Sequence, residues 1–168
     1  MNVEKSTNAE SLRHWWTPQR HAVKSLLLLV LWSVWWGGLT FYAVVVVPIG
    51  TEVLGSVEQG FVTQQVTHWH NALTGLMSLT LLVRAYLDRS RTLWIIAATL
   101  TAISIALVIW HARLTGMMNF EHQTVPGGFY GEHAVYLWMT AAEWFLGMVI
   151  PMWLLPVDAP ASQQDETG

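Results

Sequence analysis

The chain has 168 residues, of which 53% are hydrophobic and 11% are charged, and its formal net charge at pH 7 is -3. This composition is too apolar and too poor in charge for an ordinary soluble domain, and it excludes a basic nucleic-acid-binding protein. The chain has no cysteine, which excludes disulfides, thiolate metal sites and thiol redox chemistry.

Four apolar segments follow one another along the chain and predict an all-α polytopic membrane protein, a bundle of four transmembrane helices. A helix needs about 20 residues to cross a bilayer core about 30 Å thick, and three segments come close to that length. The second segment is the weak one, because it must include Asn71 and the residues around Arg84; a re-entrant segment is the alternative there. The predicted spans are residues 25–47, 70–87, 93–110 and 134–155, inside a transmembrane domain over residues 18–156.

The two ends of the chain are predicted to lie outside this domain. Residues 1–17 form an N-terminal segment, and Pro18 is predicted to be the first helical residue because proline loses no hydrogen bond there. The first apolar segment is longer than the core of a signal peptide and lacks a small-residue cleavage pattern, so it is expected to remain as a span. The tail, residues 157–168, is polar and is predicted to be disordered.

Positive charges set the orientation of the predicted bundle. Seven of the eight Lys and Arg residues lie before the first span or in the short second connection, namely Lys5, Arg13, Arg20, Lys24, Arg84, Arg89 and Arg91. The positive-inside rule places these segments, and both termini, on the cytoplasmic side of an inner-membrane type of bilayer. The first connection, Gly50 to His70, and the third, His111 to Glu132, then lie outside.

Two interpretations of the first connection stay open. Leu54, Val57 and Phe61 recur at near-helical spacing, which favours a short helix on the outer membrane surface. The alternative is an ordinary amphipathic connector, since Gly60 interrupts the pattern. The third connection is predicted to be a loop over the outer end of the bundle, because it contains Pro126, Gly127, Gly128 and Gly131.

Histidines gather on the predicted outer side of the membrane. Five of the seven lie at outer span ends or in the outer loop, namely His68, His70, His111, His122 and His133. Inward-facing side chains at one level of a four-helix bundle can converge on a single ion or cofactor. We therefore predict that His70, His111 and His133 bind a cofactor, with His68 as a fourth metal ligand. Imidazole suits copper, zinc or haem iron, and the supplementary candidates are Met117, Met118 and Glu121.

Two other interpretations of these histidines remain open. The side chains could face the lipid headgroups, because opposite rotations of the helices would scatter them there. They could also form a hydrogen-bonded polar cap with Asn71 or Glu132, which would make them sensitive to pH without binding a metal.

A polar stripe on the predicted fourth span supports an inward face for His133. His133, Tyr136, Thr140 and Glu143 lie at i, i+3, i+7 and i+10, which is one side of a helix. Glu143 falls near the bilayer midplane, where an ionisable group is costly and indicates a functional site. It is interpreted either as a structural, hydrogen-bonded acid or as a proton carrier.

The other predicted spans carry similar polar seams, typical of membrane helices that pack through small and hydroxyl-bearing residues. On the first span the seam is Ser33, Gly37 and Thr40; on the second it is His70, Thr74 and Ser78; on the third it is Thr101, Ser104 and His111.

Two stretches near the end of the first span resemble a known family. They are Gly37-Gly38-Leu39-Thr40-Phe41-Tyr42-Ala43-Val44-Val45-Val46-Val47-Pro48 and Val53-Leu54-Gly55-Ser56-Val57-Glu58-Gln59-Gly60. They resemble the small four-helix membrane family that includes transmembrane-protein-205-like domains. The resemblance implies a glycine-bearing first helix that ends at a proline, and it implies no enzymatic activity and no catalytic residues. Copper-resistance D-type membrane domains are a second resemblance, carried by His70, His111 and His133.

The sequence thus predicts a small integral membrane protein of unassigned activity, with a metal or haem in an outward-facing histidine cluster. One alternative is a structural or assembly subunit in which Gly37 and Gly38 pack against a membrane partner or a second copy. Another is a proton-coupled carrier that uses Glu143. No phosphate loop, serine elbow or His-Glu-x-x-His motif supports an enzyme.

Overall fold

The computed structural model describes residues 4–119, 121–122 and 124–154, with side chains from Val23 onward. Every regular element in these ranges is helical, which confirms the all-α class; the β-bridge that they contain joins Asn119 to Thr124. The predicted disordered tail, residues 157–168, lies outside the described residues. The elements are α1 (Glu4–Phe41), the π-helical turn η1 (Tyr42–Val46), α2 (Val47–Leu54), α3 (Ser56–Asp88), α4 (Arg91–Met117), α5 (Phe129–Val149) and α6 (Pro151–Leu154).

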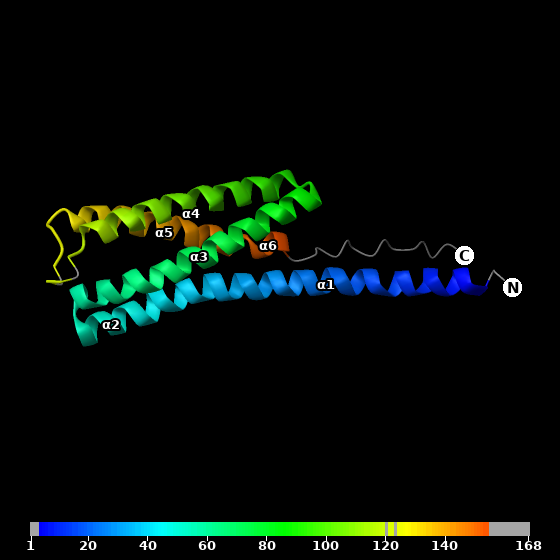
Figure 1. The fold of residues 1–168 in the computed structure, drawn as a ribbon, viewed down its shortest axis with the longest axis horizontal. Coiled ribbons are helices and arrows are strands. Elements are labelled where there is room, and N and C mark those ends of the chain that lie inside the picture. Colours follow the sequence, from blue (N-terminus) through cyan, green and yellow to red (C-terminus); the bar gives the residue numbers. More distant parts are fainter. Residues whose placement is uncertain (1–3, 120, 123, 155–168) are drawn as a thin grey trace, which may run out of the picture.

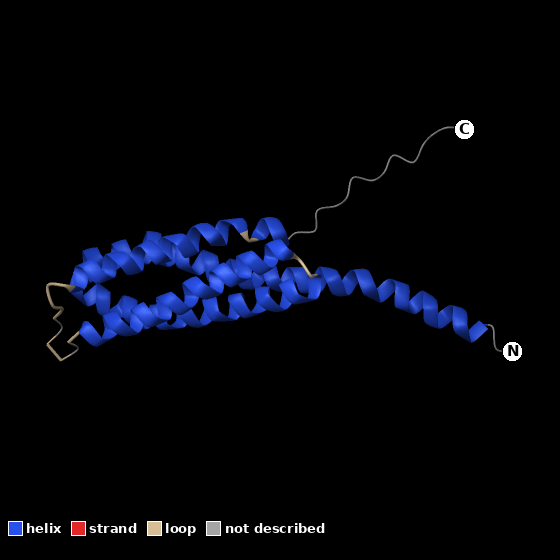
Figure 2. Cartoon of the chain, turned by 90° about the horizontal axis from the view of Figure 1, so that it is seen from above, coloured by secondary structure: helices blue, strands red, loops and turns tan. Residues whose placement is uncertain are grey.

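The helices lie alongside one another in an elongated bundle (Figure 1). α3 packs on α1 and α4, and α5 packs on α4 and α1. The α2–α3 turn and the α4–α5 loop lie at one end, which we call the outer end after the predicted orientation (Figure 1). The α3–α4 turn and α6 lie at the opposite, inner end, beyond which the N-terminal part of α1 extends (Figure 2).

The first helix begins earlier than predicted. α1 starts at Glu4, so the prediction that Pro18 is the first helical residue is wrong. A proline inside a helix removes a single backbone donor, and the residues on both sides of Pro18, such as Leu12 and Ala22, favour helix.

A π-helical turn lets the same helix continue past Pro48. Pro48 has no backbone N–H, and its ring crowds the carbonyl group one turn earlier. The turn η1 widens the helix just before it, and the N–H of Val47 donates to the carbonyl of Tyr42, five residues back instead of four. α2 then ends at Gly55, whose φ of 98° lies in a region that side chains disfavour.

The first predicted connection is helical on both sides of a turn at Gly55, so the helical interpretation around Val57 and Phe61 is confirmed and the connector interpretation is wrong. α3 starts at Ser56 and runs for 33 residues without a break. It is longer than the short helix expected here, and the predicted second span, residues 70–87, is only its inner part. The polar residues that interrupt the apolar pattern face a cavity inside the bundle, as described below.

The remaining helices follow the prediction more closely. Ser90 caps α4 by accepting a hydrogen bond of 3.3 Å from the backbone N–H of Leu93, after Arg89 has turned the chain with a φ of 51°. Both α4 and α5 extend beyond the predicted spans at their outer ends, and the predicted loop joins them.

Three helical stretches of the described residues are long and apolar enough to cross a membrane, namely Val23–Leu54, Arg91–Met117 and Phe129–Leu154. This supports the prediction of a membrane protein. α3 is long enough but is not among them, because its outer part is rich in glutamine, threonine and histidine.

The apolar core lies in the inner half of the bundle. All the helices except α2 contribute to it or pack against it, and its buried members are Trp35, Met77, Leu81, Ile96, Ala97, Leu100, Ile150 and Leu154. Side chains of the outer half leave more space between the helices, as the cavity below shows.

Indole rings join α1 to α5. The Trp36 ring stacks on Trp32 and on Trp144, with ring centroids 5.4 and 5.5 Å apart. Trp32 donates a hydrogen bond of 2.8 Å to the carbonyl of Gly147, and Trp36 donates one of 2.9 Å to the carbonyl of Trp144. A side chain at Gly147 would overlap the Trp36 ring, so the glycine permits this close approach.

The predicted polar seams of α3 and α4 face the interior, whereas that of α1 does so only in part. Thr74, Ser78 and Ser104 are buried. Ser33 is exposed, and its hydroxyl donates to the carbonyl of Leu29 on the same helix. The seam prediction is therefore wrong at Ser33, because the large indole rings occupy the inward face of α1.

Candidate functional site

A buried carboxyl group on α5 is the centre of the candidate site. The Glu143 side chain is 0% exposed, and its Oε1 accepts hydrogen bonds from the Thr74 hydroxyl at 2.7 Å and the Trp35 indole N–H at 3.2 Å. The indole also lies 2.9 Å from the Thr74 hydroxyl oxygen, to which it can donate. Three helices, α1, α3 and α5, therefore meet at one oxygen atom.

His70 adds a basic group to this carboxyl. Its Nε2 lies 3.4 Å from Oε1 of Glu143, and its side chain is 14% exposed. His70 and Thr74 are one helical turn apart on α3, so both side chains approach Glu143 from the same face of the helix. The pair forms an ion pair when the imidazole is protonated and the carboxyl group is not.

The second oxygen of Glu143 is different. Its Oε2 is buried and has no hydrogen-bond partner among the described residues. A buried polar atom without a partner is rare and calls for an explanation, since it costs about 1–3 kcal/mol. Oε2 is therefore the one polar atom of this buried carboxyl group that the described side chains leave unsatisfied.

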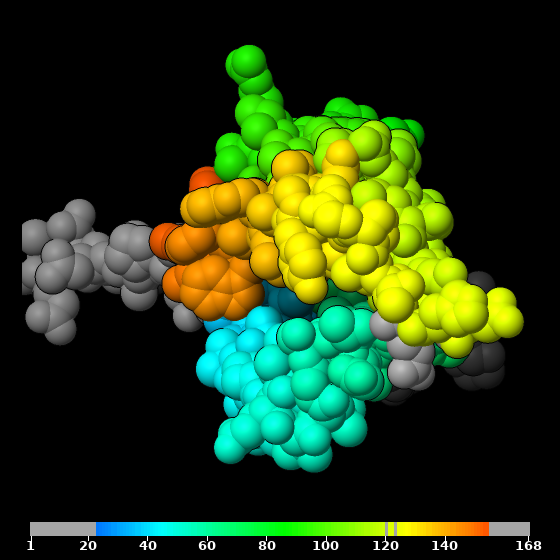
Figure 3. All heavy atoms as spheres, turned by 90° about the vertical axis from the view of Figure 1, so that its left-hand side faces the viewer, coloured from blue at the N-terminus to red at the C-terminus, as the bar shows by residue number. Residues whose placement is uncertain are grey.

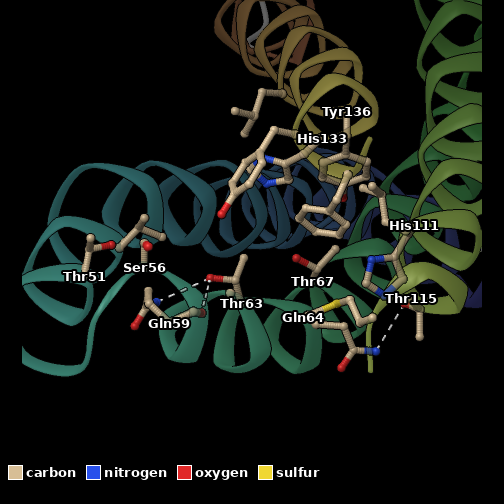
Figure 4. Close-up of a pocket in the computed structure, with 17 residues that line it drawn as sticks. Thr51, Ser56, Gln59, Thr63, Gln64, Thr67, His111, Thr115, His133 and Tyr136 are labelled. Atoms are coloured by element: carbon tan, nitrogen blue, oxygen red, sulfur yellow. Dashed lines mark hydrogen bonds between the residues drawn. The ribbon is translucent and has the colours of Figure 1, made fainter. Parts of the chain in front are cut away.

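A cavity of about 320 Å³ lies between Glu143 and the outer end, with α2 and α3 on one side and α4 and α5 on the other (Figure 4). Seen from the outer end, the molecule is hollowed between these two pairs of helices (Figure 3). The wall from α2 and α3 carries the polar side chains of Thr51, Ser56, Gln59, Thr63, Gln64 and Thr67, with Val47 and Gly60 beside them. Gln64 reaches across to α4, where its Nε2 donates to the Thr115 hydroxyl at 3.4 Å.

The opposite wall combines rings with a thioether. It contains His111, Thr115, Met118, Phe129, His133 and Tyr136, together with Leu114, Tyr130 and Leu137. The His133 ring stacks on Phe129 at a centroid distance of 5.7 Å and an interplanar angle of 12°. The ring centroids of His111 and Tyr136 lie 6.3 Å apart. No Lys, Arg, Asp or Glu residue lines the cavity, so its described lining carries no fixed charge.

Tyr136 connects the cavity to the buried carboxyl group. It lines the cavity, and the side chains of Thr67, Asn71 and Thr140 lie within interaction range of its hydroxyl group, with Glu143 close enough to act on it electrostatically. Polar side chains therefore continue from the cavity to the centre of the bundle.

A second polar cluster holds α3 against the first helix. The Tyr42 hydroxyl, from the π-helical turn, donates to the Thr63 hydroxyl at 3.1 Å, and Gln59 Nε2 lies 3.4 Å from the Tyr42 oxygen. Gln59 is 3% exposed, and its side chain occupies the space that a side chain at Gly50 would need. Through Tyr42, the π-helical turn therefore helps to hold the α3 wall of the cavity in place.

The predicted histidine cluster is divided in the structure. His111 and His133 line the cavity, whereas His70 turns deeper toward Glu143. His68 is exposed beside Trp69, and His122 lies exposed in the loop. No hydrogen bond of the described residues joins His70, His111 or His133 to Asn71 or Glu132, so the predicted polar cap does not form. Glu132 pairs with Arg113 on the surface, and the Asn71 side chain lies near Tyr136.

The metal and haem prediction gains no support from this geometry. Among the described residues, no group of three or more His, Asp or Glu side chains is placed to hold a metal ion. His68, His70, His111 and His133 therefore stay a predicted ligand set rather than an assembled one. The supplementary candidate Met118 lines the cavity, and Glu121 is exposed in the loop.

The stripe predicted on the fourth span is the part of the site that the structure assembles. His133 and Tyr136 line the cavity, and Glu143 is fully buried below them. The Thr140 hydroxyl donates to the backbone carbonyl of Tyr136 and lies near the tyrosine side chain.

Sequence reasoning missed two groups of site residues. Trp35 is one, and no signal in the sequence separates it from Trp32 and Trp36, which also lie inside the predicted span. The other is the polar wall of α3. Gln59, Thr63 and Thr67 step by four along a segment interpreted as a connector, and that spacing indicated a helix face.

A scan of the chain against protein-family models finds no match, and neither do searches of curated proteins and of solved structures. The two resemblances noted in the sequence therefore stay predictions. The function has to be argued from the geometry of the site.

Proposed function

We propose that the chain is an integral membrane protein with four spans and both termini at the cytoplasmic face of an inner-membrane type of bilayer. Lys24 of α1 and Arg84 of α3 line one groove at the inner end, Arg89 lies in the adjacent turn, and Arg91 begins α4. These four positive residues of the two predicted cytoplasmic segments lie at the same end of the bundle, which supports this orientation under the positive-inside rule.

In this proposal α3 is the fourth span, despite its lower hydropathy. Polar side chains are tolerated at membrane depth where they face other protein groups or a cavity. Those of α3 do so, at the cavity wall and at Glu143. A bundle of this kind is also what the resemblance to transmembrane-protein-205-like domains implies.

Within this bundle we propose a proton-coupled carrier, in which Glu143 and His70 hold the coupling proton. The observation that carries the proposal is the buried contact of 3.4 Å between the two groups, with the second carboxyl oxygen left without a partner. A structural acid would be expected to have both oxygens satisfied. An ionisable pair inside a membrane domain is a functional site by default.

The arrangement corresponds to an outward-open state. Protons reach the cavity from the outer end and pass the Tyr136 level to His70 and Glu143. Below Glu143, Leu146 and Gly147 of α5, and Ile150 just after its end, pack against α1 and the apolar core. Release toward the inner end therefore requires the indole contacts between α1 and α5 to separate.

Infrared difference spectroscopy tests whether Glu143 exchanges its proton. In purified wild-type protein, we expect a carboxylic acid C=O band that changes with pH and shifts in D2O, and that is lost in Glu143→Gln. Glu52→Gln, an exposed position on α2, is the matched control and should keep the band. If the Glu143 band changes neither with pH nor in D2O, Glu143 is a structural acid and the proposal is overturned.

Proteoliposomes test the coupling itself. The vesicles contain a pH-sensitive dye, which reports the internal pH while a transported solute is added. The internal pH should change with wild-type protein and with Glu52→Gln, and should stay constant with Glu143→Gln. Proton movement that survives Glu143→Gln would exclude this residue as the coupling group.

A second candidate function, assembly with a membrane partner or a second copy of the chain, is favoured by one observation. Side chains built at Gly37 and Gly38 on α1 would meet no atom within 4 Å, so no described residue of this chain uses the smooth surface that these glycines create. Small residues allow close approach of membrane helices. Gly37→Leu should then reduce co-purification or dimerisation without affecting the infrared band of Glu143, whereas an unchanged assembly state would count against this candidate.

A further inference from the structure

We infer that the groove between α1 and α3 at the inner end binds one anionic phospholipid of the cytoplasmic leaflet, with its phosphate at Lys24 and Arg84 and an acyl chain along the leucines of α1. This inference rests on the topology in the proposed function, since it takes the inner end to lie at the cytoplasmic face. It does not depend on a carrier role of Glu143. Three observations carry it: the apolar walls of the groove, the charges at its inner end, and the exposed aromatic rings beside it.

The groove lies where α1 and α3 diverge toward the inner end (Figure 1). Its volume is about 640 Å³, which is within the range of about 300–1,000 Å³ for small-molecule sites. Each helix contributes residues spaced three and four apart, which lie on one side of a helix. The set on α1 is Lys24, Leu27, Leu28 and Leu31, and the set on α3 is Thr80, Val83, Arg84, Leu87 and Asp88. The lining therefore runs along both helices.

The polar and apolar parts of this lining are separated along the bundle axis. Lys24 is the member of the α1 set nearest the inner end, and Leu27 and Leu31 follow it toward the outer end. α3 runs the opposite way, so Val83 lies on the outer side of Arg84. Leu27 and Val83 are 63% and 51% exposed, and exposed apolar surface of this kind suits contact with acyl chains. The groove thus has the same division as a phospholipid, with charge at one end and apolar surface along the rest.

The charges at the inner end suit a phosphate group. The Lys24 side chain is exposed and has no ion-pair partner among the described residues. Arg84 donates from Nε to the Asp88 carboxylate at 3.1 Å, and its two other guanidinium nitrogens have no partner in the described part of the chain. Guanidinium and ammonium groups form short, strong hydrogen bonds to phosphate oxygens. Both groups line the groove, so a headgroup there can reach them.

The net charge of the groove selects a lipid with one negative charge. Lys24 and Arg84 contribute two positive charges and Asp88 contributes one negative charge, which leaves a net charge of +1. The Asp88 carboxylate is already paired with Arg84, so it is not free to bind the ammonium group of a zwitterionic lipid. A phosphodiester headgroup such as phosphatidylglycerol balances the remaining charge. Basic pockets between membrane helices at the cytoplasmic face bind anionic headgroups in this way.

Aromatic side chains beside the groove mark the depth of the headgroups. Tyr86, Leu87, Arg89 and Trp94 line an adjacent hollow, and Leu87 also lines the groove. Tyr86 is 72% exposed and Trp94 is 42% exposed. Tyrosine and tryptophan concentrate at the interface between membrane and water, where one part of the ring is buried and the polar group stays wet. The charged end of the groove therefore lies at the level of lipid phosphates.

Native mass spectrometry of the purified full chain in detergent tests the inference. The probes are phosphatidylglycerol and phosphatidylcholine with the same acyl chains. We expect one phosphatidylglycerol to bind at least about tenfold more tightly than phosphatidylcholine, as one charge-assisted hydrogen bond implies. Equal binding of the two lipids would overturn the inference.

Two other occupants are distinguished in the same experiment. Glycerol 3-phosphate, which has no acyl chains, should not displace the lipid, because it leaves the apolar walls uncovered. Displacement would make the groove a site for soluble phosphate compounds and overturn the lipid assignment. A dimer of the chain that retains no lipid would make a second copy the occupant, with the same consequence.

Charge variants locate the lipid. Lys24→Gln and Arg84→Gln should each weaken phosphatidylglycerol binding about tenfold. Arg91→Gln is the matched control, because Arg91 lies at the same end of the bundle but does not line the groove. Asp88→Asn should tighten binding, since it removes the negative charge from the described lining, and misfolding cannot produce such a gain. Equal affinities of Arg84→Gln and Arg91→Gln would place the lipid elsewhere and overturn the inference.

The outcome is separable from that of the proposed function. If phosphatidylglycerol binds at the groove but Glu143 shows no exchangeable infrared band, the lipid site stands and the carrier function fails. If the band exchanges but the two lipids bind equally, the reverse holds. Arg89→Cys tests the topology, because the chain has no other cysteine. A membrane-impermeant maleimide should label this variant in inside-out vesicles, and labelling only in right-side-out vesicles would overturn the cytoplasmic placement of the groove.

Discussion

The inner and outer halves of the bundle are built from different side chains and differ in how well they fill space. In the inner half, apolar residues of α1, α3, α4 and α6 are fully buried, and three indole rings stack between α1 and α5. In the outer half, hydroxyl, amide and imidazole groups line a cavity of about 320 Å³. The buried Glu143 lies where the two halves meet.

This difference separates close apolar packing from polar, cavity-lining groups along the bundle axis. The inner half holds the helices together through apolar burial and close ring contacts, both of which tolerate little change. The outer half keeps polar groups available in a space that the protein does not fill. Each of the following changes tests one side of this comparison or the boundary between them.

The largest effect is expected at Gly147, where the inner half has no spare room. A side chain there would overlap the Trp36 ring, which other indoles hold in place on both sides. Gly147→Leu should lower the free energy of unfolding by about 3 kcal/mol, the upper end of the usual cost of overpacking. Thermal unfolding in mild detergent measures this change. Gly75→Leu is the control, and an equal loss in both variants would contradict close packing in the inner half.

The next largest effect is expected at the boundary. Trp35→Phe keeps most of the ring but removes the N–H that faces Thr74 and Glu143. Loss of a buried donor to these groups should destabilise the protein by about 2 kcal/mol. Circular dichroism during thermal unfolding measures it. The exposed Trp94→Phe is the matched control, and a Trp35→Phe variant as stable as that control would show that the indole N–H contributes nothing.

A smaller effect is expected where the outer half contacts the first helix. Thr63→Val preserves shape but removes the oxygen that accepts from the Tyr42 hydroxyl, so the loss should be about 1 kcal/mol. Thr80→Val on the same helix is the control, because the Thr80 hydroxyl bonds to the carbonyl of Leu76 in its own helix. Thermal unfolding measures the loss of stability in both variants. Equal losses would mean that the contact between η1 and α3 does not support the outer half.

The smallest effect is expected at the cavity wall, and its sign is opposite. Gly60 lies in the interior of α3 with open space beside it. Gly60→Ala should raise the free energy of unfolding by about 0.5–1 kcal/mol, the usual difference between glycine and alanine in a helix. The same thermal unfolding experiment measures this gain. A destabilised Gly60→Ala variant would indicate that the outer half is packed as tightly as the inner half.

Sequence reasoning located the most important residue of the site but not its surroundings. The spacing of His133, Tyr136 and Glu143 placed them on one face of a helix, and a carboxyl group deep in an apolar span stood out on energetic grounds. Trp35 was not recognised, because nothing in the periodicity of α1 distinguishes it from the tryptophans beside it. Its role depends on Glu143, which lies more than a hundred residues away in the chain.

Local rules failed where tertiary contacts outweighed them. Proline at position 48 predicts the end of a helix, yet the π-helical turn absorbs it and the helix continues to Leu54. Gly60 favours a connector in the outer part of α3, yet this part is a continuous helix and forms one wall of a cavity. In both cases the deciding contacts, such as that between Tyr42 and Thr63, join separate helices.

The sequence by itself determined the helical class, the apolar stretches long enough to cross a membrane, and the polar stripe of α5, because composition and periodicity act within one segment. Only the tertiary structure decided that His70 turns to Glu143 while His111 and His133 turn to the cavity. The rotation of each helix about its axis depends on how side chains from different helices fit together. That fit here is set by the indole contacts of the inner half, which hold α1 and α5 together and leave the outer half open.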